Sequence, residues 1–375
     1  MKPICPADFP WKDYKRYTYP LGLDLGPVSF LSGLTASTYD AATDQIVSTG
    51  DLKAQTGVAL EKISLILKTA GYGFDDAVSL IQYVAPGAFE QLGELRAIIR
   101  AAGLDGAVAH IVPVTRLLRR DALVELEVIA ARGGQRSPAG ACAMRILAGE
   151  QAIVMTGATD APSGATTQVA LKAQVDAIGR MLKTAGCDWS NVARCRLVLA
   201  SDRVDEVESA TAMVRAMVPE LPVIPAVGVK AVPAGTPAAR FSVEWSLAGG
   251  NTAKPVESAG ALVRRAGPFL VVTGMLGGGA DTGITAQAER IYGQQLPQLL
   301  AEAGLGIECI VQTVEWLTRD ALPEYKDTGS IRRNTLREPF PVSSGLVCSV
   351  LPGGARLAVD VVAIDPALAS GGIWV

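Results

Sequence analysis

The sequence has very few of the side chains that bind metal ions. It contains one histidine, His110, and its six cysteines stand singly, with no CxxC pair. Structural zinc sites take four Cys or His ligands at short spacings. The glycine-rich stretch Gly274–Ala280 lacks the GK[ST] of a phosphate-binding loop and the GxGxxG of a dinucleotide fold, so we interpret it as a turn. We therefore expect neither a metal nor a cofactor, and reduced, mostly buried thiols.

Long apolar runs and an excess of basic charge are also missing. No stretch of about 20 uninterrupted apolar residues could span a bilayer, and the N-terminus is polar and proline-rich where a signal peptide would be apolar. The 34 Lys and Arg residues are outnumbered by 37 Asp and Glu, a net charge of -3. Such a chain has no global field to hold a phosphate backbone. We expect a cytoplasmic protein that binds neither membranes nor nucleic acid.

A repeated pattern is what the sequence does contain. The five residues Leu67–Gly71 recur letter for letter as Leu182–Gly186, and in weaker form as Leu300–Gly304. Each segment closes a run of apolar residues at roughly helical spacing, and glycine ends helices because it adopts the left-handed conformation without strain. A chain of 375 residues that is 49% hydrophobic is long enough for several buried domains. The pattern predicts three copies of one domain.

The apolar periodicities predict the same elements in each copy: two strands, a helix, a strand, a second helix and two closing strands. Among them are a strand over Ala77–Val84, a helix over Val204–Met217 and a closing strand over Val108–Leu118. The first copy carries an insertion around Ser37 to Gly50. Two joints rich in Gly and polar residues, Arg132–Gly140 and Gly249–Pro255, separate the copies. We therefore place the domains at residues 1–136 (with an N-terminal extension), 137–252 and 253–375.

Three landmarks resemble the RidA/YjgF family, whose fold is chorismate-mutase-like. They are a first strand ending in Ser32-Gly33, a helix ending Ala70-Gly71, and the closing segments Ala122–Ala130 and Pro341–Gly354. The resemblance implies an α/β (α+β) chain of three tandem RidA-like β-β-α-β-α-β-β domains that form an intramolecular pseudo-trimer. Family members usually form homotrimers with small-molecule clefts between subunits, and many hydrolyse reactive enamines or imines. The implied partner is a small-molecule substrate or ligand, and further association into a homo-oligomer of pseudo-trimers stays open.

The resemblance also indicates where catalytic residues should lie. The family's carboxylate-binding arginine is absent, because alignment on the closing strands puts His110, Ile224 and Ser343 at its position in the three copies. The family's glutamate matches Glu125 in the first copy. His110 and Glu125 on adjacent closing strands could face one cleft, the imidazole titrating near neutral pH and the carboxylate orienting water.

The second and third copies depart further from the family at the glutamate position. Alignment puts Ala358 there in the third copy and, with a gap, Ser242 in the second. The first copy is therefore the one expected to keep an acid/base pair. A buried structural histidine and a solvated glutamate are the alternative interpretations of His110 and Glu125.

A serine pair gives a second catalytic possibility. Ser343 and Ser344 occupy the arginine's site, and ring-opening amidohydrolases of the cyanuric acid hydrolase and barbiturase group use a serine nucleophile in a single-chain pseudo-trimer. That group has a Ser and a Lys in every copy, a pattern that this chain lacks. Arg332, Arg333 and Arg337 either replace the missing anion clamp or form a solvated helix end.

Two functions follow from these residues. The first is a hydrolase acting on a C–N bond of a small molecule, an enamine, imine or amide, at a cleft between copies. The second is a catalytically inactive binding or regulatory protein, which the missing arginine favours.

Overall fold

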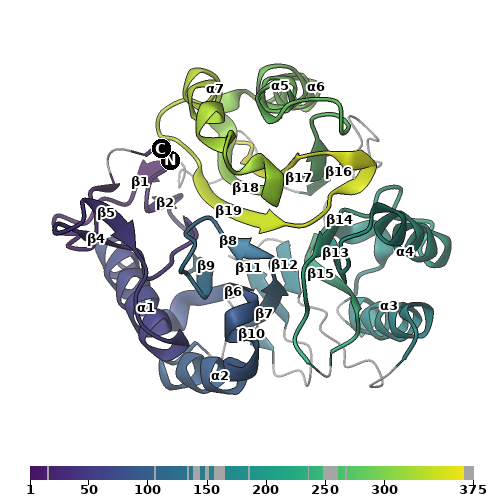
Figure 1. The fold of residues 1–375 in the computed structure, drawn as a ribbon, viewed down its shortest axis with the longest axis horizontal. Helices are drawn as coiled ribbons and strands as arrows, with labels where there is room; N and C mark the ends of the chain where they lie inside the picture. Colours follow the sequence, from purple (N-terminus) through teal and green to yellow (C-terminus); the bar gives the residue numbers. More distant parts are fainter. Residues whose placement is uncertain are drawn as a thin grey trace.

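The structure of the chain is a computed structural model. Three six-stranded sheets lie around the centre of the molecule, and the helices cover their outer faces (Figure 1). The residues that the structure describes are 1–14, 17–104, 107–132, 135–137, 144–147, 152–155, 165–184, 186–234, 236–247, 261–266 and 268–366.

The first sheet has the strand order β1-β2-β3-β9-β6-β7. Its strands are β1 Lys2–Pro3, β2 Gly22–Asp24, β3 Val28–Leu31, β6 Ala77–Val84, β7 Val108–Pro113 and β9 Val124–Ala131. Two helices cover it, α1 Leu52–Thr69 and α2 Leu92–Ala101. The predicted insertion is a separate hairpin of β4 Thr38–Asp40 and β5 Gln45–Val47.

The second sheet has the order β10-β11-β12-β15-β13-β14. Its strands are β10 Gln135–Ser137, β11 Met144–Leu147, β12 Ala152–Met155, β13 Val192–Ala200, β14 Ala226–Val229 and β15 Ala239–Leu247. Its helices are α3 Thr167–Thr184 and α4 Val204–Met217. Because β10 pairs with β11, this sheet begins within the predicted joint, slightly before the boundary expected at residue 137.

The third sheet has the order β16-β17-β20-β18-β19-β8, so it takes one short strand from the first part of the chain. Its strands are β16 Leu262–Ala266, β17 Phe269–Leu276, β18 Ile310–Thr318, β19 Val342–Cys348, β20 Leu357–Ile364 and β8 Arg116–Leu117. Its helices are α5 Ile284–Arg290, α6 Leu296–Glu302 and α7 Gly329–Thr335.

The helix that runs from α5 to α6 widens into a π-helix over Ile291–Gln295. Pro297 follows two residues after its end. A proline inside a helix has no N–H to donate and clashes with the carbonyl four residues before it. The wider turn accommodates the proline without ending the helix.

All three sheets have the same connectivity. In each sheet two antiparallel strands form a hairpin, and the second of them pairs with the last strand of the unit. The last strand also pairs antiparallel with a central strand, whose other neighbour runs parallel to it. A register shift recurs near the start of the long central strand, at Ser79 in β6, Arg194 in β13 and Gln312 in β18. These three positions therefore correspond.

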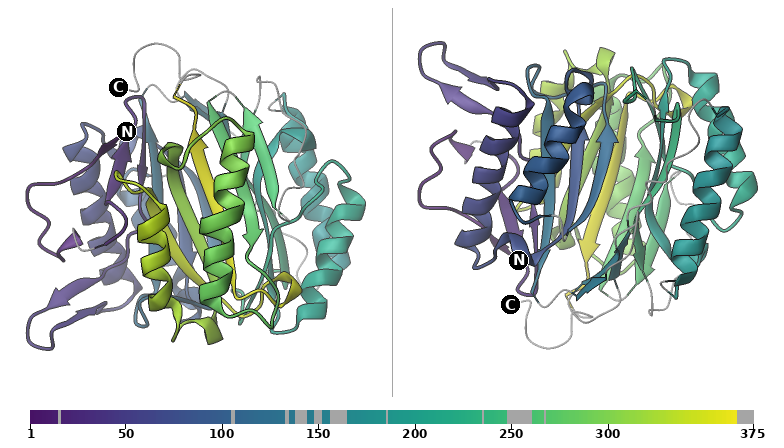
Figure 2. Two further views of the ribbon diagram at one scale, coloured as in Figure 1. Left: turned by 90° about the horizontal axis from the view of Figure 1, so that it is seen from above. Right: turned by 90° about the horizontal axis from the view of Figure 1, so that it is seen from below.

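Each sheet packs its outer face against its own helices, which gives three separate apolar cores. The inner faces meet at the centre, where side chains from all three sheets form two further apolar clusters. Figure 2 shows the strands passing through the middle of the molecule with the helices outside. The three sheets thus share one interior, which is why residues far apart in sequence come together there.

The predicted helix ends are confirmed. Gly71, Gly186 and Gly304 all have a positive φ, between 71° and 76°, directly after α1, α3 and α6. The described cysteines are free, and four of them are buried while Cys5 is exposed, in line with the expectation of mostly buried thiols. None of the helices in the described ranges is both long and apolar enough to cross a membrane.

Candidate functional site

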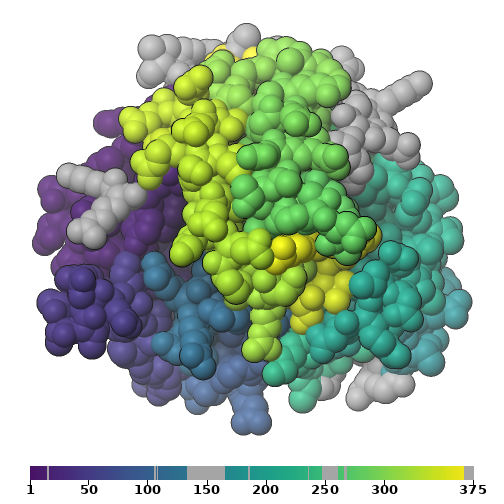
Figure 3. All heavy atoms as spheres, turned by 45° about the horizontal axis from the view of Figure 1, so that its top comes forward, coloured from purple at the N-terminus to yellow at the C-terminus, as the bar shows by residue number. Residues whose placement is uncertain are grey.

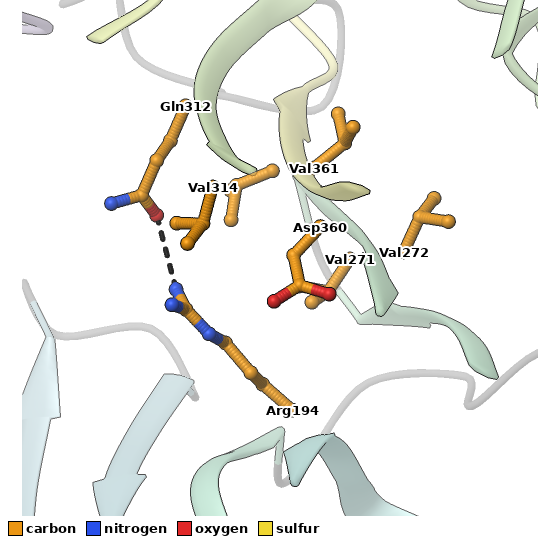
Figure 4. Close-up of a pocket in the computed structure, with 8 residues that line it drawn as sticks. Arg194, Val271, Val272, Gln312, Val314, Asp360 and Val361 are labelled. Carbon is orange, nitrogen blue, oxygen red and sulfur yellow. Dashed lines mark hydrogen bonds between the residues drawn. The ribbon is translucent and has the colours of Figure 1, made fainter. Parts of the chain in front are cut away.

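A layer of charged side chains crosses the shared interior. Arg194 lies with its Nε 2.5 Å from Glu244 Oε2 and its Nη2 3.7 Å from Glu127 Oε1, and it donates to Gln312 Oε1 at 3.2 Å. The pocket at this point is lined by Arg194, Gln312, Asp360 and valines (Figure 4) and has no space for even a water-sized molecule. The layer therefore holds the three sheets together and is not a substrate site.

A second meeting point joins the first and third sheets. Gly33 donates its N–H to the carbonyl of Ser343 at 3.1 Å, and Ser343 donates its N–H to Ser32 Oγ at 3.0 Å. Ser32 Oγ in turn donates to the carbonyl of Pro20 at 2.6 Å. The small-residue pair after β3 is thus bonded to β19, and the space beside it is lined by residues from both sheets.

The Ser-Gly pair is a bulge in β3. Leu34 pairs with Leu126 after the strand ends, so one extra residue is accommodated on the β3 side. The Thr273-Gly274 pair forms the same irregularity in β17, where Gly274 has a φ of 77°. A bulge turns the backbone aside and opens the ladder locally, which leaves room for side chains of the neighbouring strand.

Glu125 and Ser344 fill that room. A Cβ built on Gly33 would lie 2.0 Å from Glu125 Oε1 and 2.7 Å from Ser344 Oγ, so a larger residue there would have to displace both side chains. Ser344 Oγ donates to Glu127 Oε2 at 2.7 Å and is also within hydrogen-bonding reach of Glu125. Two carboxyl groups and one hydroxyl therefore meet at the junction of the two sheets.

The two carboxyl groups have different environments. Burial, and then the neighbouring charge of Glu127, raises the pKa of Glu125 to about 8, although Lys12 and Ser344 oppose the shift. Burial also raises the pKa of Glu127, but Arg194 opposes it. A buried carboxyl without an ion pair keeps its proton, whereas one beside a guanidinium favours the anion. Glu125 is therefore the proton-carrying member of the pair near neutral pH.

The N-terminal segment covers this junction. Lys12 Nζ lies 5.1 Å from the centre of the Tyr17 ring, and the Tyr17 and Tyr19 rings stack 5.1 Å apart. Burial raises the pKa of Tyr19, which also responds to Arg119 and Glu125. Figure 3 shows the start of the chain, in purple, lying against the yellow-green surface of the third part.

Arg119 reaches the same place from the turn before β9. Leu117 of β8 pairs with Leu346 of β19, and Leu118 lies directly against Gly345, so that a Cβ there would be 2.3 Å from Leu118 Cδ1. Arg119 follows Leu118 in the sequence. Its charge acts on both Lys12 and Tyr19.

His110 does not share this site, which corrects the expectation that it lies beside Glu125. Strand β6 separates β7 from β9, and His110 is affected instead by Arg240 and Arg194 of the second sheet. Burial, and then these two arginines, lowers the pKa of His110 to about 3. The imidazole is therefore neutral at physiological pH and does not titrate there as predicted.

The register also corrects the alignment of His110. Strands β6 and β18 each contain a register shift, at Ser79 and Gln312. Counted from these positions, Ile81 corresponds to Val314. Ile81 pairs with His110, and Val314 pairs with Ser344. His110 thus corresponds to Ser344, one position beyond the place of the family's arginine, because the turn before β9 shifts the alignment by one residue.

The sequence alignment of the second sheet is shifted as well. Tyr83 pairs with Glu125, and the corresponding residue of β13, Val198, pairs with Arg240. Arg240 therefore takes the place of Glu125 in the second sheet, and Ser242 lies two positions farther along. An arginine there explains why His110 has basic neighbours where Ser344 has acidic ones.

Arg332 neither is free nor lies at a solvated helix end. It forms an ion pair with buried Glu315, in which Arg332 Nη1 lies 2.9 Å from Glu315 Oε2. Its guanidinium also lies 4.7 Å from the centre of the Tyr325 ring. Arg333 and Arg337 are exposed, as a solvated helix end requires. None of the three replaces the missing arginine at the junction.

Comparison with known sequences identifies the chain. The sequence model of the family described as Endoribonuclease L-PSP matches residues 14–132. A RutC family protein of Pyrococcus horikoshii is 34% identical over 113 residues, which are 30% of this chain and 85% of that protein. The chain belongs to the RidA/YjgF family. The matched residues 14–132 include Glu125, whereas Lys12 and Ser344 lie outside this range.

Solved structures of RidA/YjgF proteins also match. Escherichia coli TdcF with bound serine is 26% identical, covers 31% of this chain and 88% of its own length, and has a TM-score of 0.26. The YjgF gene product of E. coli is 25% identical, covers 35% of this chain and 99% of its own length, with a TM-score of 0.29.

Several residues of this site were not predicted from the RidA/YjgF pattern. Lys12, Tyr19 and Arg119 lie in irregular segments, where no periodicity marks a side chain as inward-facing. Glu127 was not among the predicted catalytic residues. The alternation of Glu125-Leu126-Glu127 does indicate that both carboxyls share one face, and this signal could have found the pair.

Changing Gly33 to Ala tests how tightly the junction is packed. The added methyl must displace the Glu125 carboxyl, so we expect a loss of about 1–3 kcal/mol in the free energy of unfolding, the usual cost of overpacking. Denaturant titration measures it. In a background of Glu125→Ala the same change should cost less, because the closer of the two clashing side chains is gone and only Ser344 Oγ remains near the added methyl. An equal cost in both backgrounds would show that the strain lies elsewhere.

Proposed function

We propose that the three sheets with their helices are three copies of the RidA-like domain, arranged as an intramolecular pseudo-trimer. The identical connectivity of the sheets, the shared bulge of the central strands and the left-handed glycines after α1, α3 and α6 support this. Gly33 faces Ser344, and Gly274 faces Pro225 in the same way at the junction of the second and third sheets. The junctions are thus related in geometry but differ in chemistry.

At the junction of the first and third sheets, this protein would hydrolyse a C–N bond of a small imine or enamine. The observation that carries the proposal is the meeting of Glu125, Glu127 and Ser344 in one buried junction, where burial raises the pKa of Glu125 to about 8. Such a carboxyl donates a proton at neutral pH and takes one back when ionised. The junction of the second and third sheets has Pro225 and Ala358 at the corresponding places, so no carboxyl stands there at the position of Glu125.

The proposed reaction uses the proton that Glu125 carries. Glu125 protonates the imine nitrogen, and the resulting carboxylate accepts a proton from the water that attacks the carbon. Glu125 then donates this proton to the amino nitrogen of the carbinolamine and accepts the hydroxyl proton as the C–N bond breaks, which releases a ketone and ammonia. While Glu125 is protonated, its O–H can donate to Ser344 Oγ, and Ser344 donates to Glu127, so the hydroxyl keeps the acid oriented.

The alternative is a binding protein without chemistry. It is favoured by the absence of the family's arginine, whose place in the third sheet is taken by Ser343. A serine cannot hold a carboxylate through two parallel hydrogen bonds as a guanidinium does. Under this alternative, the junction binds a small molecule but releases no product.

Ammonia release from freshly generated amino-acid-derived imines, cyclic amides and ureides separates the two functions. We expect an imine to be turned over, with ammonia formed above the rate of spontaneous hydrolysis. The same compounds should be tested for a rise in melting temperature, because a ligand that binds the native state stabilises it. Stabilisation without any ammonia release would contradict the hydrolase and support the binding protein.

A further inference from the structure

The two carboxyl groups of β9 share one hydroxyl group. Ser344 Oγ lies 2.7 Å from Glu127 Oε2, and Glu125 Oε1 and Ser344 Oγ lie 2.0 and 2.7 Å from the same point, the place of a Cβ on Gly33. A serine hydroxyl has one proton, so it donates to one of the two carboxyls and can accept from the other. The direction of this hydroxyl therefore depends on which carboxyl is the anion.

Glu127 is the carboxyl that the surroundings favour as an anion, and all three sheets contribute to this. Tyr83 of the first sheet donates to Glu127 Oε2 at 3.3 Å, and Ser344 of the third sheet donates to the same oxygen. Arg194 of the second sheet lies with its Nη2 3.7 Å from Glu127 Oε1. That distance is too long for a hydrogen bond, so the guanidinium acts on Glu127 through its charge, which water does not screen in this buried place.

The guanidinium of Arg194 is fixed in direction by its other partners. Its Nε lies 2.5 Å from Glu244 Oε2, and its Nη1 donates to Gln312 Oε1 at 3.2 Å (Figure 4). The corresponding residues of the other two sheets are Ser79 and Gln312, which carry no charge. The second sheet thus supplies a cation that the first and third sheets lack at this position.

The two carboxyls differ in what a proton on each could reach. Glu125 lies beside Gly33, at the junction of the first and third sheets. Glu127 is 1% exposed and is directed at Arg194, beside which the interior has no space for even a water-sized molecule. A proton on Glu127 would therefore be out of reach of a ligand at the junction, whereas a proton on Glu125 would be available to it.

We propose that Arg194 is a positioning residue for the acid at the junction: by holding Glu127 as an anion, it places the proton of the carboxyl pair on Glu125. Ser344 then donates to Glu127 and presents its lone pairs to the O–H of Glu125. This role rests on the proposed hydrolase, but the place of a proton is an equilibrium property and can be measured without turnover. All three sheets would then contribute to a site that lies between two of them.

The other groups that act on the carboxyl pair do not favour this proton position through a charge. Burial raises the pKa of both carboxyls and so does not distinguish them. Lys12 favours ionised Glu125, and Glu244 disfavours ionised Glu127, so both charges oppose the proposed position. The uncharged groups that act on the pair are Tyr83, Gln312 and Ser344. Among the described groups, Arg194 is therefore the charge that decides between the two carboxyls.

The test follows the two carboxyls directly by NMR. The full chain is labelled with carbon-13 at the side-chain carboxyl of glutamate and titrated from about pH 4 to pH 10, a range that covers raised carboxyl pKa values. Glu125→Gln and Glu127→Gln each remove one signal and so assign the pair. In the wild type we expect Glu127 to ionise first as pH rises, and Glu125 to ionise near pH 8.

Arg194→Met should reverse this order. Glu127 then keeps its proton, and Glu125 ionises without an anion beside it, so the midpoint of Glu125 should fall by about one pH unit or more, a tenfold change in its acid dissociation. Arg194→Lys keeps a buried cation and should retain the wild-type order. Arg203→Met removes a surface cation that is 75% exposed and should leave both midpoints unchanged.

Glu127→Gln is a second test, which leaves Arg194 and its pairing with Glu244 in place. Removing the anion beside Glu125 should lower the midpoint of Glu125 as Arg194→Met does. An unchanged midpoint of Glu125 in either variant would overturn the proposal, as would a wild type in which Glu125 ionises before Glu127. If Arg194→Met does not fold, the midpoint of Glu125 in Glu127→Gln decides by itself.

Turnover separates this role from the proposed hydrolase. The pH above which ammonia release falls should move down together with the Glu125 midpoint in Arg194→Met and Glu127→Gln, whereas a loss of folding would lower the rate at every pH. If the wild type releases no ammonia, the hydrolase is wrong and the order of ionisation still tests Arg194. Ammonia release from a wild type whose order of ionisation does not depend on Arg194 would overturn the positioning role and leave the hydrolase in place.

Discussion

Replacing Arg194 with methionine is expected to lower the free energy of unfolding by about 3–5 kcal/mol, the usual cost of breaking a buried ion pair from one side. Arg194 is 2% exposed and lies against Glu127 and Glu244, which belong to two different sheets. Without the guanidinium, both carboxyls stay buried without their cation. Guanidinium chloride denaturation of the full chain measures the loss.

The pH dependence of this loss has a definite sign. Removing Arg194 removes an effect that lowers the pKa of Glu127, so that pKa rises further above its unfolded value. A carboxyl with a raised folded pKa destabilises the native state as pH rises from its unfolded pKa toward its folded pKa. The deficit of the variant should therefore be smallest near pH 4 to 5 and should grow toward neutral pH.

Arg203→Met provides the control, because Arg203 pairs with Glu206 on the surface and is 75% exposed. Surface pairs contribute about 0–1 kcal/mol, so this variant should remain close to the wild type. Combining Arg194→Met with Glu127→Gln and Glu244→Gln should recover much of the loss, since no buried charge remains unpaired. If Arg194→Met cost no more than Arg203→Met, the charged layer would not hold the sheets together.

Much of the fold could be predicted from the sequence, because its regular elements have regular signals. Val204–Met217 and Ala77–Val84 were predicted to the residue. Apolar spacing determines both, since one face of each element must be buried. Predictions were less accurate where the chain leaves this regularity. The strand expected over Val108 to Leu118 is two strands, and its second part, β8, pairs with the third sheet.

The candidate site could be predicted only in part. Glu125 and Ser344 were both singled out, from different parts of the chain, but nothing in either pattern indicated that they meet. That contact depends on how two sheets approach each other, which is a property of the whole interior and leaves no local periodicity. The position of His110 was predicted wrongly for a local reason. The sequence did not show the length of the turn before β9, so the alignment was shifted by one residue, and a shift of one residue gives a strand residue a different neighbour.

Replacing Glu125 with glutamine is expected to lower kcat/KM for imine hydrolysis by about 10²- to 10⁴-fold, the usual contribution of a general acid/base. Glutamine has the same shape but carries no transferable proton. The wild-type rate should be steady below pH 8 and fall above it, because the pKa of Glu125 is raised to about 8 and the acid is lost as pH increases. The variant's remaining activity should lack this fall. Steady-state ammonia release from pH 5 to 9 measures both effects.

Stability should change in the opposite direction, which separates a catalytic role from a structural one. Because the folded pKa of Glu125 lies above its ordinary value of 4.5, the wild type loses stability as pH rises from about 4.5 to about 8. Glu125→Gln removes that ionisation, so the variant should match the wild type near pH 5 and exceed it at pH 8 to 9. Glu61→Gln, at an exposed position of α1, should change neither property. A variant that is inactive and also less stable at pH 9 would mean that Glu125 supports the fold as an anion, and the proposed acid would have to be sought elsewhere.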